Sequence, residues 1–236
     1  MVKRLDKTSF HATIGRTGPA ACLVCLPVLV LLPPHQPTKP GETRRVSSDD
    51  CRLDPPLPAG AACKRRLLVA EAERWVGVRE QGLRRGQIVE LFQAWNDKVD
   101  HVAWCMAFAQ YCLKQTDRLY DRLVGHCTRV RHKLFPTEHV MTAWDRTPKP
   151  HRRQTPEPGL IAVWQRYRDG EPVLAGHTGI VIEASPRADT FTTVEGNTTV
   201  PGTEGFVRGV AEKQRNLNAQ RGPLRLRGFL DPYEGL

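Results

Sequence analysis

The stretch HTGIVIEASPRADTFTTVEG, residues 177–196, indicates the fold class. Two short runs rich in β-branched residues flank a Ser-Pro pair, which is a turn signal. Five such runs follow Pro148, with turn signals such as Asp-Gly and Gly-Pro between them, over residues 159–167, 177–185, 190–196, 205–213 and 224–231. Since no helical pattern separates them, they predict an antiparallel sheet of about five strands.

The residues before Pro148 follow the helical period instead. Apolar side chains recur near every third and fourth position over 64–78 and 86–99, which predicts two amphipathic helices. Residues 103–115 are apolar nearly all round and predict a buried central helix, and a fourth helix is expected at about 137–146. Because the predicted helices come first in the chain and the predicted strands follow, we expect an α+β fold, with N-terminal helices packed on a C-terminal antiparallel sheet.

Charge and proline are concentrated at the N-terminus. Residues 1–66 hold 11 Lys or Arg against 5 Asp or Glu, and 9 of the 19 prolines. We therefore predict a basic, Pro-rich leader and linker over 1–63 and one folded domain over 64–236. A basic leader favours anionic partners such as membrane lipid or cell-wall polymer.

Within the leader, PAACLVCLPVLVLLPP (19–34) is an apolar run preceded by basic residues. This order resembles a secretory signal or a weak anchor, although the run is shorter than the ~20 residues that a spanning helix needs. We expect a secreted, periplasmic or membrane-associated protein, with cytoplasmic storage until release and an unstructured tail as open alternatives. No second apolar run of this length occurs, which excludes a multi-span membrane protein.

The chain has seven cysteines, an odd number, so at least one thiol is unpaired within a monomer. Cys22 and Cys25 form a C-x-x-C pair without a matching Cys or His pair at zinc-site spacing, so no metal site is predicted. Cys51 and Cys63 could form a disulfide if the protein is exported.

Cys105 is either a core residue or a nucleophile. It follows Trp104 at the expected start of the central helix, where unpaired N–H groups and the helix dipole favour a thiolate. A cysteine nucleophile needs a base, and the base needs a third group that orients it. His177 begins one predicted strand and Glu195 ends the next, so hairpin pairing would bring them to one edge of the sheet. Cys112, two turns along the helix, is expected to be a core residue.

Five segments together resemble a known family: AERWVGVRE, AWCMAFAQYCL, PGLIAVWQ, GHTGIVIE and TVEGNT. In this order they resemble the cysteine, histidine-dependent amidohydrolase/peptidase (CHAP) domain, which is related in fold to NlpC-type and papain-like thiol hydrolases. The resemblance covers residues 68 to about 231. It implies Cys105 as nucleophile, His177 as base and Glu195 as the residue that orients the imidazole. Asn197 matches a further polar position found in part of the family.

The same resemblance implies a bacteriolytic hydrolase of bacterial cell-wall peptidoglycan. The activity would be that of an N-acetylmuramoyl-L-alanine amidase or of an endopeptidase for the stem peptide or cross-bridge, with no metal or organic cofactor. Two alternatives stay open. One is a non-catalytic wall-binding or assembly protein on the same scaffold, and the other is a thiol amidase or protease for a non-wall peptide. QGLRRGQ (81–87) and the long connection 116–158 depart from the family pattern, which leaves the cleaved bond open.

Three further stretches are basic: 126–133, 146–153 and 221–227. Two interpretations are open. These stretches are either solvated surface segments, or they bind anionic cell-wall polymers or lipid. Nucleic acid is not predicted as a partner, because almost no aromatic residues are interleaved with the charges as stacking platforms.

Overall fold

The computed structural model describes residues 59–96, 102–124, 131–185, 189–202, 205–218 and 222–235. All of them belong to one unit, Lys39–Leu236. The apolar run 19–34 and the rest of the predicted leader up to residue 58 lie outside the described residues. In the part that is described, no helix combines the length and the apolar character that crossing a membrane requires.

The helices lie where the periodicity predicts them, with shifted ends: α1 (Ala59–Glu73), α2 (Gln87–Gln93), η2 (Ala94–Asn96), α3 (Cys105–Leu123), α4 (Val140–Arg146) and η3 (Lys149–His151). The first helix ends before the expected residue 78, because the backbone N–H of Gly77 donates to Val210 of the sheet and draws the chain away. The central helix runs past the expected residue 115. Asp117, in this added part of the helix, is buried, and its ion pair of 2.8 Å with Lys64 of α1 offsets the cost of burying the charge.

All sheet pairings are antiparallel, in the order β1-β6-β2-β3-β4-β5. The strands are β1 (Arg152–Arg153), β2 (Ile161–Arg168), β3 (Glu171–Ser185), β4 (Thr190–Gly202), β5 (Gly205–Asn216) and β6 (Leu224–Leu230). The α+β class is confirmed, and the expectation of about five strands is wrong, since the described residues form six. The additional strand, β1, has two residues and therefore no alternation that a sequence pattern could reveal.

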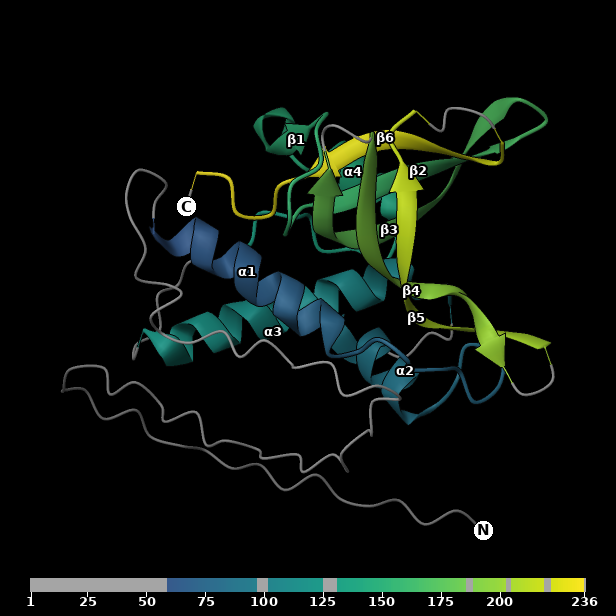
Figure 1. Ribbon diagram of the computed structural model, residues 1–236, viewed down its shortest axis with the longest axis horizontal. Helices are drawn as coiled ribbons and strands as arrows, with labels where there is room; N and C mark the ends of the chain where they lie inside the picture. Colours follow the sequence, from purple (N-terminus) through teal and green to yellow (C-terminus); the bar gives the residue numbers. More distant parts are fainter. Residues whose placement is uncertain are drawn as a thin grey trace, which may run out of the picture. The chain divides into compact units, whose positions relative to one another are not determined.

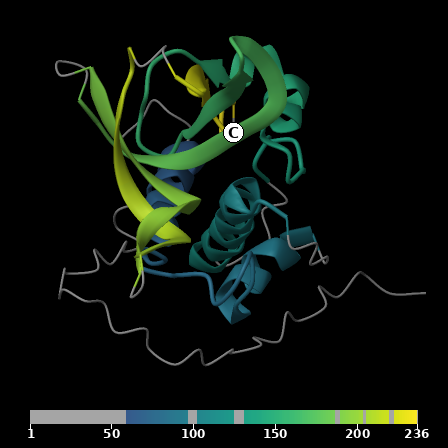
Figure 2. The same cartoon turned by 90° about the vertical axis from the view of Figure 1, so that its right-hand side faces the viewer.

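Helix α3 packs on the sheet, which α1 and α4 also contact. It contacts β3 and β4 on one side and α1 and α2 on the others. Figure 1 shows α1 and α3 side by side below the strands, and Figure 2 shows α3 with β4 and β5 on one side and α2 on the other. The first residue of α3 is thereby held against the centre of the sheet.

An aromatic cluster fixes the start of α3. The ring of Phe92 from α2 lies 5.8 Å from Trp104, 5.1 Å from Phe108 and 5.3 Å from Tyr111 between ring centroids. Trp75, which follows α1, packs edge-on against Phe92 at 5.2 Å. Aromatic pairs add about 0.5–1.5 kcal/mol each beyond their buried area, and Trp104 is held in this cluster by its tilted contact with Phe92.

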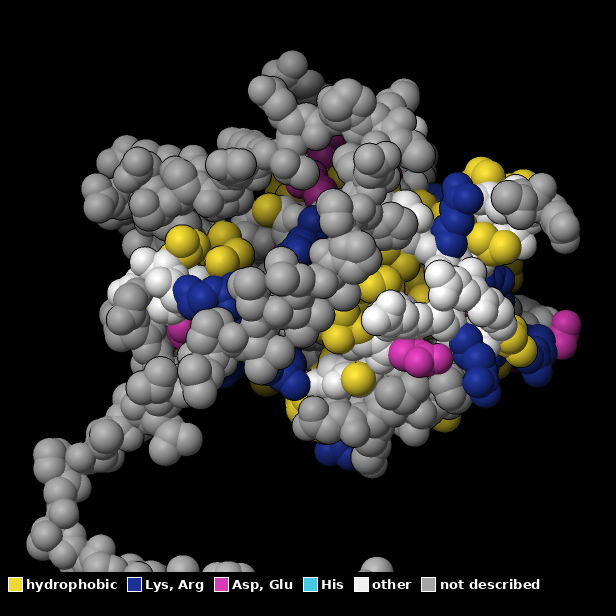
Figure 3. Space-filling model, turned by 90° about the horizontal axis from the view of Figure 1, so that it is seen from below, with side chains coloured by type: hydrophobic (Ala, Val, Ile, Leu, Met, Phe, Trp, Pro, Cys, Tyr) yellow, Lys and Arg dark blue, Asp and Glu magenta, His cyan; other side chains and the backbone are white. Residues whose placement is uncertain are grey.

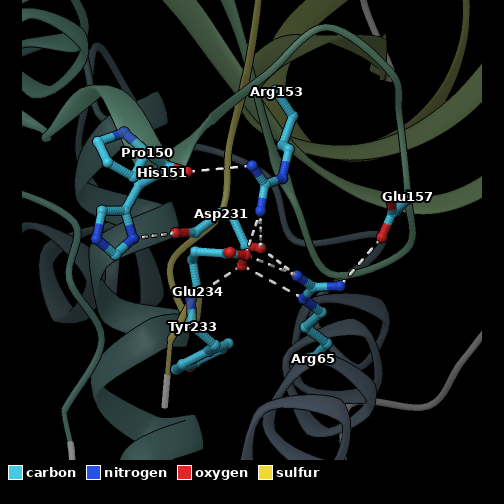
Figure 4. A network of polar contacts seen from close by, with 8 residues as sticks. All are labelled: Arg65, Pro150, His151, Arg153, Glu157, Asp231, Tyr233 and Glu234. Atoms are coloured by element: carbon cyan, nitrogen blue, oxygen red, sulfur yellow. Dashed lines mark hydrogen bonds and ion pairs between the residues drawn. The ribbon is translucent and has the colours of Figure 1, made fainter. Parts of the chain in front are cut away.

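Ion pairs join α1 to the end of the sheet (Figure 4). The guanidinium of Arg65 forms two hydrogen bonds with the buried carboxylate of Asp231, directly after β6, and one with Glu157. Arg153 of β1 pairs with Glu234. These contacts hold the C-terminal residues on α1 and so close the sheet onto the helical layer.

Candidate active site

Cys105 is the first residue of α3, and its free thiol is 4% exposed. The preceding Trp104 is completely buried, and its indole N–H donates to Glu80 at 2.6 Å. Glu80 is itself held by a backbone hydrogen bond from its N–H to Arg208 of β5. The start of the helix is therefore fixed, and its first N–H groups have no partner within the helix.

Gly196 explains why the helix approaches the sheet so closely. A Cβ atom at this position of β4 would lie 2.6 Å from Cβ of Phe108 and 2.9 Å from Trp104. Neither contact is possible for real atoms, so only glycine allows the first turn of α3 to rest on β4. The glycine of the E-G-N motif thus brings Cys105 to the strand that carries Glu195.

His177 of β3 lies between Cys105 and Glu195. Its Nε2 is 2.8 Å from Oε2 of Glu195, which leaves Nδ1 as the ring nitrogen available to the sulfur. Burial lowers the pKa of His177, but hydrogen bonds and charge interactions with Cys105 and Glu195 outweigh burial and raise it to about 9. The imidazole is therefore a cation at neutral pH.

Glu195 is completely buried and accepts four hydrogen bonds. Besides His177, the donors are the hydroxyl of Thr193 at 2.7 Å and two nitrogens of Arg215, Nε at 2.7 Å and Nη2 at 2.6 Å. Burial raises the pKa of Glu195, yet the hydrogen bonds and positive charges of His177 and Arg215 outweigh burial and lower it to about 2. The carboxylate is charged throughout the neutral range.

Gly179 makes room for this carboxylate. It lies two residues after His177 on β3, and a Cβ atom there would be 2.7 Å from Cγ of Glu195 and 3.1 Å from Cβ of Thr193. The second glycine of G-H-T-G is therefore required where the side chain of Glu195 crosses β3 toward the imidazole.

Arg215 is a residue that the sequence analysis missed. Besides binding Glu195 with two nitrogens, its guanidinium lies over the ring of Trp164 at 5.1 Å, and Trp164 is next to the imidazole of His177 with 5.9 Å between centroids. In the sequence, Arg215 is one of several charged residues in an alternating polar run. Only the β4–β5 register, which pairs Phe191 with Arg215, reveals its position.

Asn197 stands apart from the hydrogen-bonded group. It has a positive φ of 55° at the irregularity of β4 between Glu195 and Thr198. Its side chain lines the same cavity of about 610 Å³ as Cys105 and His177. The structure thus places Cys105, His177 and Asn197 around one cavity, with Glu195 hydrogen-bonded to His177.

The other described cysteines are buried away from this cavity. Cys112 is a free thiol with no exposed surface, and burial raises its pKa well above the usual value. Cys63 is disulfide-bonded, and its partner lies outside the described residues because Cys105 and Cys112 are free. The pairing with Cys51 stays a prediction.

The comparisons with known proteins agree with the motif analysis. The family model described as CHAP domain matches residues 95–197, a range that contains the cysteine, the histidine, the glutamate and the asparagine discussed above. No curated protein matches the chain significantly, and neither does any solved structure.

Proposed function

Residues 95–197 form a CHAP domain, and on this premise we propose that the protein is a cysteine-dependent hydrolase of peptidoglycan amide bonds. The observation that carries the proposal is the series Cys105–His177–Glu195 at the start of a buried helix, beside a cavity of about 610 Å³. It is the nucleophile, base and orienting-group arrangement of thiol hydrolases. The papain-like relationship of the fold is part of the same proposal.

The reaction would be acyl transfer in two steps. The sulfur of Cys105 attacks the amide carbonyl, and the protonated His177 gives its proton to the leaving amine, so that a thioester forms and the free amine departs. The imidazole, now neutral, takes a proton from water as the water attacks the thioester. The carboxylic acid product leaves, and the thiolate–imidazolium pair is restored.

Two further groups would assist these steps. The carboxylate of Glu195 holds Nε2 of His177 at 2.8 Å, which fixes the orientation of the ring and favours its cationic form. The N–H of Cys105 at the start of α3 is a donor for the oxyanion of the tetrahedral intermediate, where the helix dipole adds to its effect. We propose Arg215 as a positioning residue that acts through Glu195.

Location and targeting belong to the same proposal. A peptidoglycan hydrolase must reach the wall, and the basic leader 1–63 with its apolar run 19–34 would supply secretion or membrane association. Basic side chains of the leader and surface loops would bind anionic wall polymers or lipid. The folded catalytic domain would span residues 64–236, with α1 extending it to Ala59.

The test is mass spectrometry of the fragments that the purified protein releases from peptidoglycan. New amino and carboxyl ends would identify an amidase or an endopeptidase, and both agree with the proposal. Cys105→Ala should abolish release while keeping the circular dichroism spectrum and the melting temperature. Cys112→Ala is the matched control, because it removes a buried thiol of the same helix without touching the cavity. Full activity of Cys105→Ala, or wall binding by the wild type without any turnover, would contradict the proposal.

A further inference from the structure

Five Lys and Arg side chains line the cavity beside Cys105. Its basic side chains come from three separate parts of the chain, namely the segment before α2, strand β2 and strand β5: Arg84, Arg166, Arg208, Lys213 and Arg215. Among the described residues that line it, Glu80 is the one with a carboxylate. None of these basic residues belongs to the three basic stretches that stand out in the sequence.

Part of this charge is neutralised within the site. Arg215 pairs with the buried Glu195, and the cationic imidazole faces the sulfur. The remaining cations on β5 make their hydrogen bonds to uncharged atoms. Arg208 donates to the hydroxyl of Thr199 at 2.9 Å, and Lys213 donates to the backbone carbonyl of Thr199 at 2.9 Å. These contacts hold the two side chains in place without cancelling their charge.

The surplus cations flank the catalytic group on two sides. On β2, Arg166 lies two residues beyond Trp164, which pairs with His177 in the sheet register. On β5, Lys213 lies two residues before Arg215 and therefore on the same face of that strand. A substrate that crosses the cavity past the thiol would meet positive charge on both sides of the scissile bond.

Basic side chains also lie on the surface that is seen from below. Figure 3 shows dark-blue Lys and Arg side chains spread among yellow apolar ones, with few magenta carboxylates between them. Charges in a concave site act over a longer range than on a flat surface, because the low-dielectric walls focus the field. The cavity is thus suited to attract and hold an anion.

We infer that this cavity selects peptides with free carboxylates close to the scissile amide, and that Arg166 and Lys213 bind these carboxylates. The inference rests on the proposed function and narrows it. In peptidoglycan the N-acetylated glycan is uncharged apart from optional modifications, whereas the peptide carries carboxyl groups that are either free or amidated. The site would therefore act on wall peptides with free carboxyl groups and act poorly on the amidated forms.

The test compares two substrates that differ only in one group. Muropeptides with the same sequence and the same scissile bond are prepared with either free carboxyl groups or carboxamides beside that bond, and kcat/KM is measured for each. We expect kcat/KM to be at least about tenfold higher for the carboxylate form, since a hydrogen bond to a charged group is among the strong ones. The ratio should fall as salt is raised from 0.05 to about 0.5 M, because salt screens partly exposed charges.

Variants assign the effect to residues. Arg166→Gln and Lys213→Gln should each lower the carboxylate-to-carboxamide ratio of kcat/KM by about threefold or more, in the range of a partly exposed ion pair. Arg168→Gln is the matched control, because Arg168 is an exposed arginine of the same strand β2 that does not line the cavity. It should leave the ratio and the activity unchanged.

The possible failures are distinguishable. Equal kcat/KM for the two substrates, or an unchanged ratio in both Gln variants, would overturn the inference and leave the hydrolase proposal intact. Absence of cleavage of both muropeptides and of whole peptidoglycan would overturn the proposed function, and the inference with it.

Discussion

Removal of Arg215 tests whether the buried carboxylate is held as the structure indicates. In Arg215→Ala, Glu195 loses two of its four hydrogen bonds and one of its two neighbouring positive charges. The carboxylate would still accept hydrogen bonds from His177 and Thr193. It would stay buried, however, with fewer hydrogen bonds and less positive charge to offset the cost of burial. The pKa of Glu195 should therefore rise from about 2 toward its usual value of 4.5.

The expected loss of stability follows from the burial of the two partners. Breaking a fully buried ion pair by removing one partner costs about 3–5 kcal/mol. The side chain of Arg215 is 32% exposed and Glu195 is not exposed at all, so solvent screening reduces the expected cost. We expect the free energy of unfolding at pH 7 to fall by about 2 kcal/mol.

The pH dependence of this loss separates the ion pair from simple packing. A carboxylate whose folded-state pKa is lowered stabilises the fold above its unfolded pKa of about 4.5, and this contribution disappears as the pH falls through about 2. The difference between wild type and Arg215→Ala should therefore be largest at neutral pH and shrink on acidification. Urea unfolding at pH 7, 5, 4 and 3, followed by tryptophan fluorescence, measures it.

Two further variants complete the experiment. Arg215→Lys keeps the positive charge but cannot make the two-nitrogen contact with Glu195. It should therefore be more stable and more active than Arg215→Ala, but less so than the wild type. Arg227→Ala removes an exposed arginine of β6 and should change the free energy of unfolding by less than about 0.5 kcal/mol. The reasoning is refuted if Arg215→Ala is no less stable than Arg227→Ala at pH 7, or if its loss is the same at every pH.

Three other predictions concern single features of the structure. The imidazole of His177 should titrate near pH 9 in an NMR experiment, and a value below about 7 would contradict the contacts with its two partners. Gly179→Ala should cost about 1–3 kcal/mol of stability and most of the activity, because the new methyl group overlaps Glu195; wild-type kcat would argue against this crowding. Lys64→Met should destabilise the fold by about 3 kcal/mol, because the buried Asp117 loses its ammonium partner and keeps only the contacts with His132. A urea unfolding curve that matches the wild type would refute this last expectation.

Local patterns predicted much of the fold. The change from a helical to an alternating period at Pro148 separated the α-helices from the strands, with only the short η3 after it, because each period reflects which face of an element is buried. The ends were less accurate, since α1 ends through a hydrogen bond from Gly77 to β5 and α3 continues through the pair of Asp117 and Lys64. Both causes join residues far apart in the chain, and neither leaves a local trace.

By itself the sequence predicted which residues would carry the proposed chemistry. A cysteine at a helix start, a histidine that begins a strand and a glutamate that ends the next are recognisable from residue type and order, and the hairpin rule places the latter two together. Only the tertiary structure decided what surrounds them. The bond of Arg215 to Glu195 and the cationic lining of the cavity depend on strand register and on segments separated by up to about 130 residues. Charges so scattered along the chain become a site only when folding places them around one cavity.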